Sequence, residues 1–129
     1  MQEPGDLADQ YAATVVDAAI EVHRHLGPAF LEQVYENALC HELRTREVPF
    51  ERQLFVPVLY KGLKVGEGRI DLLVGSLVVL ELKALPDLKR IHTAQLLSYL
   101  KATRLRLGLL LNFGQLRMRS GIRRLVHTP

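Results

Sequence analysis

Residues 77–85, LVVLELKAL, limit the possible folds of this chain more than any other stretch. The residues Val78, Val79 and Leu80 are typical of a buried β-strand, whereas the charged residues Glu81 and Lys83 are not. Because alternate residues of a strand share a face, these two charges point the same way. A buried ion pair contributes little to stability, so the pattern favours a functional site over a structural Lys–Glu pair.

A third charged residue, Asp71, lies ten positions before Glu81 in the preceding predicted strand. A two-residue loop at 75–76 would place Asp71 opposite Leu80, facing away from Glu81. A three-residue loop at 75–77, a common type when it contains glycine, would pair Val74 with Val78 and bring Asp71 beside Glu81. In that register Asp71, Glu81 and Lys83 share one face of the sheet.

Two neighbouring carboxylates repel each other unless a cation lies between them. Oxygen-only ligands favour a hard ion, so Asp71 and Glu81 suggest a site for Mg²⁺ or Mn²⁺. Lys83 could then hold a phosphate or orient a water molecule. The structural alternative is a buried Lys83–Glu81 ion pair with Asp71 solvated at the end of its strand.

The remaining pattern predicts one domain over residues 1–129. Apolar periodicity and turn residues predict the order helix, helix, strand, strand, strand, helix, strand. The helices are expected at residues 7–26, 30–46 and 88–103, the last with Asp87 as its N-cap, and the strands at 50–60, 63–74, 77–85 and 105–113. A short basic strand is expected at 115–120 and an edge at 122–127. This order predicts an α/β protein with a mixed β-sheet flanked by helices.

The charge is unevenly distributed along the chain. Residues 1–87 carry 14 acidic and 8 basic residues, a balance of −6, whereas residues 88–129 carry 9 basic residues and no acid. This asymmetry indicates either a polyanionic partner or neutralisation of one half by the other within the fold. If the partner is nucleic acid, the candidate phosphate contacts are Lys101, Arg104, Arg106, Arg117 and Arg119.

Two further features concern the compartment. A single cysteine, Cys40, rules out an internal disulfide and suits a reducing environment. The first residues, MQEPGDLADQ, have neither the basic start of a signal peptide nor an apolar run long enough for a membrane span. We therefore expect a cytoplasmic protein with no membrane association, and the sequence leaves a homodimer open.

The spacing D-x9-E-L-K, formed by Asp71, Glu81 and Lys83, resembles the core of PD-(D/E)xK nucleases. The stretches LEQVYENAL, GRIDLLV, VVLELKAL, AQLLSYLKAT and GLLLNFG more closely resemble the small GxxExxY protein family of that superfamily. The resemblance spans roughly residues 15–113 and implies a restriction-endonuclease-like core. Two positions depart from the pattern: Ala29 replaces the family glycine, and Ile70 replaces the superfamily proline before the aspartate.

The resemblance adds three candidate site residues. Glu32 matches the family's motif glutamate, which implies that it points at the metal site; the alternative is a surface glutamate. Gln95 and Tyr99 resemble the Q-x3-Y element of exonuclease-like members, which implies contact with Lys83, water or phosphate; the alternative for Tyr99 is core packing. Glu36 is expected to be solvated or to pair with a basic residue.

Two function hypotheses follow. The first is a Mg²⁺- or Mn²⁺-dependent nuclease acting on DNA or RNA, in which Asp71 and Glu81, with the Leu82 carbonyl and Glu32, hold the ion and Lys83 assists the attacking water. The second is a non-catalytic module that keeps the nuclease fold for binding nucleic acid or a protein partner. The intact Asp71, Glu81 and Lys83 favour the first hypothesis.

Overall fold

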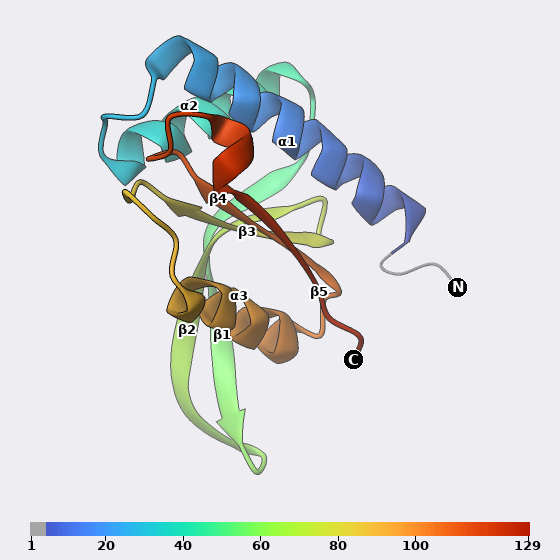
Figure 1. Ribbon diagram of the computed structural model, residues 1–129. Coiled ribbons are helices and arrows are strands. Elements are labelled where there is room, and N and C mark those ends of the chain that lie inside the picture. The colour runs from blue at the N-terminus through green and yellow to red at the C-terminus, as the bar shows by residue number, and fades with distance from the viewer. Residues whose placement is uncertain (1–4) are drawn as a thin grey trace.

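The computed structural model describes residues 5–129 and contains a five-stranded mixed sheet with helices on both faces (Figure 1). The strands lie in the order β1-β2-β3-β4-β5; β3 and β4 are parallel, and the other neighbours are antiparallel. The helices are α1 (Asp6–Leu26), α2 (Glu32–Thr45) and α3 (Arg90–Thr103), and η1 (Met118–Gly121) is a short 3₁₀-helix. The strands are β1 (Phe50–Tyr60), β2 (Leu63–Val74), β3 (Val78–Lys83), β4 (Leu107–Asn112) and β5 (Ile122–Val126). The α/β class and the mixed sheet are as the sequence predicts.

Two separate apolar clusters hold the helices to the sheet. On one face, α1 and α2 pack over side chains such as Leu72, Leu80 and Leu109. On the other face, α3 contributes Leu96 and Leu100 to a smaller cluster. Because strands β3 and β4 are covered on both faces, they are continuously apolar except where Glu81, Lys83 and Asn112 occur.

The β1–β2 hairpin extends beyond the rest of the molecule (Figure 1). Its second strand pairs with β3 only from Leu72 to Val74, so residues 54–70 form a two-stranded ribbon, here called the arm. α3 packs on one face of the arm, through Tyr99 against Gly68. The opposite face of the arm carries the exposed Phe55.

Three expectations about local structure can be checked directly. The three-residue loop is confirmed, because Val74 pairs with Val78 and Leu72 with Leu80. Asp87 as N-cap is wrong: α3 begins later, at Arg90, and the His92 ring accepts a hydrogen bond from the backbone N–H of Lys89.

The strand expected at residues 115–120 is also wrong. Residues 118–121 form a 3₁₀ turn in which Met118 is buried against the α1–α2 layer. The edge strand does form, as β5 beside β4. No helix in the described part of the chain is long and apolar enough to cross a membrane.

Candidate active site

The two carboxylates lie where β2 and β3 separate. Beyond the Leu72–Leu80 pair the ladder ends, and side chains bridge the two strands instead. The backbone N–H of Asp71 donates to Glu81 Oε2 at 3.0 Å, and the backbone N–H of Leu82 donates to Asp71 Oδ2 at 2.8 Å. Each carboxylate therefore replaces a missing ladder bond and is fixed by the opposite strand.

Burial makes this pair electrostatically costly. Glu81 is only 5% exposed and Asp71 is partly buried. Burial, followed by the charge of Asp71, raises the pKa of Glu81 to about 8, and burial likewise raises the pKa of Asp71. Within the described chain, Glu81 Oε1 accepts no hydrogen bond, so an oxygen of the pair is left for another partner.

Lys83 is held at the end of β3 by the strand beside it. The backbone N–H of Phe113 donates to the Lys83 carbonyl at 2.8 Å. The buried amide of Asn112 then accepts from Leu85 N at 2.9 Å and donates to Leu85 O at 3.0 Å, which fixes the exit of the chain. Gly114 is required here, because a Cβ at this position would lie 2.1 Å from the Leu85 carbonyl oxygen.

The start of α2 brings Glu32 toward the same place. Buried Tyr35 donates a hydrogen bond to Gly27 O, accepts one from Phe30 N at 3.1 Å, and stacks on Phe113 with ring centroids 4.7 Å apart. These contacts fix the loop before Glu32, the first residue of the helix. Partial burial and the charge of Asp71 raise the pKa of Glu32, while Lys83 acts in the opposite direction, so all three lie within electrostatic range.

Glu36, one helical turn further along α2, is buried rather than solvated and pairs with a basic residue. Its Oε2 accepts from Arg52 Nη2 at 2.9 Å and Nε at 3.1 Å. Its Oε1 accepts from Gln53 Nε2 at 2.8 Å, and the same amide nitrogen lies 3.5 Å from Asp71 Oδ1. Arg52 and Gln53 thus connect α2 to the carboxylate pair.

Gln53 is a site residue that the sequence analysis did not single out. It lies opposite Asp71 in β1, has the left-handed φ of 52°, and its buried Oε1 has no hydrogen-bond partner within the described residues. The signal was present in the sequence: Glu51, Arg52 and Gln53 are three consecutive polar residues, which interrupts the alternation expected of a half-buried strand.

The other two helix residues predicted for the site, Gln95 and Tyr99, lie on α3, which packs on the face of the arm opposite Phe55. Gln95 is exposed and its Nε2 is 3.4 Å from the Tyr99 hydroxyl. Tyr99 is partly buried in the α3 cluster. Within the described chain neither side chain hydrogen-bonds to Asp71, Glu81 or Lys83.

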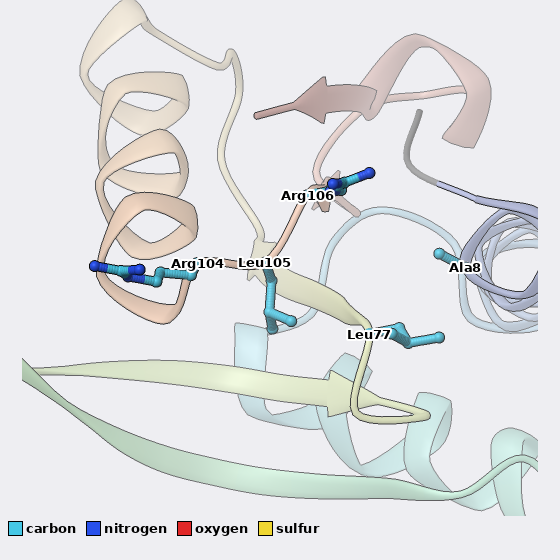
Figure 2. Close-up of a pocket in the computed structure, with 5 residues that line it drawn as sticks. All are labelled: Ala8, Leu77, Arg104, Leu105 and Arg106. Carbon is cyan, nitrogen blue, oxygen red and sulfur yellow. The ribbon is translucent and has the colours of Figure 1, made fainter. Parts of the chain in front are cut away.

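The predicted nucleic-acid contacts are spread over the molecule. Arg104 and Arg106 flank Leu105 at a cavity of about 270 Å³, and their side chains point in opposite directions (Figure 2). This cavity adjoins the start of β4, where Leu107 pairs with Val78, five residues or about 17 Å along the strand from Lys83.

The remaining basic candidates lie elsewhere. Arg117 and Arg119 line a second cavity against α1, and Lys101 lies exposed on α3. The five basic residues therefore do not form one continuous surface with the carboxylates.

The chemistry of the ligand atoms at the site suits a hard divalent ion, but the number of ligating side chains is small. Asp71 and Glu81 offer only oxygen, and a bound cation would offset the burial and the neighbouring negative charges that raise their pKa values. Among residues 5–129, however, no group of three or more His, Cys, Asp or Glu side chains is arranged to hold a metal. Mg²⁺ commonly binds through one or two carboxylates and keeps several waters, and this pair supplies two carboxylates.

A comparison with protein-family models gives an independent assignment. The model of the PD-(D/E)XK nuclease superfamily matches residues 9–125, nearly the whole chain and all five strands. No curated protein and no solved structure matched the chain. Members of this superfamily are generally nucleases and typically use divalent metal ions. With its strands, its Asp71–Glu81 pair and Lys83 in this arrangement, the chain belongs to the PD-(D/E)XK nuclease superfamily.

Proposed function

We propose that the protein is a divalent-metal-dependent nuclease that hydrolyses phosphodiester bonds of DNA or RNA, and that within the superfamily it belongs with the GxxExxY proteins. One observation carries the proposal: Asp71 and Glu81 fix each other across the β2–β3 separation, with Lys83 two residues further along. The backbone hydrogen bonds that the pair makes do not alone account for it, because burial and neighbouring negative charges disfavour the charged form of both carboxylates.

Each group then has a role in the reaction. Asp71 and Glu81, together with the Leu82 carbonyl, would hold Mg²⁺ or Mn²⁺, and Glu32 would support the ion directly or through water. Such an ion, when bound, acts as a Lewis acid toward the phosphate. Lys83 orients the attacking water and offsets the negative charge that grows on the phosphate in the transition state.

The residues around the pair position it. Glu36 accepts a hydrogen bond from the Gln53 amide, which lies against Asp71, and Arg52 neutralises Glu36. We assign Gln95 and Tyr99 to orienting the nucleic acid from the α3 side, because Gln95 is exposed there and its amide lies against the Tyr99 hydroxyl.

A cleavage assay tests the proposal. The purified chain should cut end-labelled single-stranded, duplex or branched oligonucleotides with Mg²⁺ or Mn²⁺ and not with a chelator, and Asp71→Asn should abolish cutting. The exposed Asp87→Asn variant is the matched control and should cut like the parent. If no substrate is cut although the parent binds nucleic acid, the chain is a binding module and the nuclease proposal is wrong.

A further inference from the structure

The face of the arm next to the carboxylates carries an exposed aromatic ring. Phe55 in β1 is 63% exposed, and it is one of six exposed large apolar residues of the arm, with Val58, Leu59, Tyr60, Leu63 and Val65. Its ring makes no aromatic or cation–π contact with the residues described. A single exposed apolar side chain is ordinary, but several on one element indicate a surface that binds a partner.

The register places this ring beside the site. Phe55 pairs with Arg69 across the arm, and Gln53 and Asp71, which contact each other at 3.5 Å, lie two residues nearer the core on the same two strands. Leu54 and Ile70 point toward α3, so Phe55 and Arg69 point to the opposite face. Gln53 contacts Glu36 of α2 on that same face.

The cation beside the ring is available to a ligand. Arg69 is exposed and, within the described chain, makes no hydrogen bond or ion pair. Other charges of the arm are engaged: Lys64 pairs with Glu67 at 3.3 Å, and Lys61 lies 5.4 Å from the ring centroid of Tyr60. Phe55 and Arg69 thus place an exposed ring and an exposed guanidinium on paired positions of the arm, close in sequence to Gln53 and Asp71.

We propose that Phe55 and Arg69 form a subsite for one unpaired nucleotide next to the scissile bond, which makes the preferred substrate a single strand or a single-stranded segment. The phenyl ring stacks on the base, and the guanidinium binds the adjoining phosphate. Bases within a duplex already stack on their neighbours, so the Phe55 ring can stack only on an unpaired base. The inference rests on the proposed function and adds the substrate class.

The absence of tryptophan from the chain provides a direct probe. In a Glu81→Gln background with Ca²⁺, Phe55→Trp introduces one fluorophore at the subsite. A single-stranded DNA or RNA oligonucleotide should quench its emission, whereas a matched duplex and a strand of abasic residues should not. The control is Leu7→Trp, which places a fluorophore at an exposed position of α1, away from the arm.

Affinity measurements by fluorescence anisotropy complete the test. Phe55→Ala should weaken single-strand binding about tenfold and leave duplex binding unchanged. Phe55→Tyr, which keeps an aromatic ring, should bind single strands like the parent. Arg69→Ala should weaken both substrates and lower the salt slope of binding by about one.

The outcomes distinguish a failure of the subsite proposal from a failure of the nuclease proposal. If single strands bind as tightly to Phe55→Ala as to the parent, the subsite is wrong and the nuclease proposal stands. If no nucleic acid binds at all, both fail. If the parent sediments as a dimer and Phe55→Ala as a monomer, the ring belongs to an interface between two copies and the subsite is overturned.

Discussion

At the scale of single residues, Glu81 has the most unusual chemistry. Burial and Asp71 raise its pKa to about 8, so in the metal-free protein the folded state holds a proton that the unfolded chain releases near pH 4.5. The stabilisation from this proton is fully present below pH 4.5 and is lost as the pH rises toward 8. We predict that, in chelator, the melting temperature falls between pH 5 and pH 8.

The Glu81→Gln variant gives the matching test, because its side chain cannot ionise. Its melting temperature should vary less over the same range and exceed that of the parent at pH 8. Glu51→Gln, at an exposed position of β1, should behave like the parent. Equal pH dependence in the parent and Glu81→Gln would show that Glu81 is ionised throughout.

Gln53 is predicted to act on metal binding through Asp71. Gln53→Asn tolerates the left-handed backbone but is too short to reach Glu36 and Asp71 together. Calorimetric titration with Mn²⁺ should show about tenfold weaker binding than in the parent, the usual effect of removing a residue that orients a ligand. Gln33→Asn is the control, since Gln33 contacts only Asn37 on the surface of α2; unchanged affinity in Gln53→Asn would refute the role.

The carboxylate pair and Gln53 differ in how far the sequence alone predicts their place in the site. Asp71 and Glu81 could be paired from strand alternation and loop length, which are local rules, and the register bears this out. Gln53 could not, because its role depends on α2 lying over β1 and on a backbone turn at φ 52°. Neither follows from residue spacing.

At the scale of elements, the alternation of side chains between the two faces of β2 is interrupted at Asp71. Ile70 packs with α3 and Leu72 packs with α1 and α2, although alternate residues of a regular strand share a face. This rotation separates β2 from β3, opens the site, and turns the arm so that α3 supports its other face. The two local predictions that failed, the N-cap at Asp87 and the strand at residues 115–120, also depend on tertiary contacts, including Gly121 against the Asn112 carbonyl.

The contact between α3 and the arm gives a prediction at this scale. A Cβ at Gly68 would lie 2.5 Å from Tyr99 Cε1, so Gly68→Ala should destabilise the protein by about 1–3 kcal/mol through overpacking. In a Tyr99→Ala background the same substitution should cost much less. Gly66→Ala, with open space around its Cβ, is the control in urea unfolding. An equal cost with and without Tyr99 would show that the ring does not hold the arm.

At the scale of the whole molecule, ion pairs within the fold explain part of the charge asymmetry. Arg124 of β5 pairs with Asp9 of α1 at 2.7 Å, so part of the basic C-terminal third does neutralise the acidic half. Arg104 and Arg106 lie at the opposite end of the sheet from Lys83. Composition could reveal an imbalance of charge but not its position, because position depends on which strand ends meet.

The central claim is that Lys83 serves the chemistry while Asp71 and Glu81 bind the ion. One measurement tests it most directly: cleavage and Mn²⁺-induced thermal stabilisation recorded together on the parent and Lys83→Ala. We predict that Lys83→Ala keeps the Mn²⁺ stabilisation, since a charged lysine cannot be a metal ligand, and loses cleavage by at least about a hundredfold. Cleavage by Lys83→Ala at the rate of the parent would contradict the account.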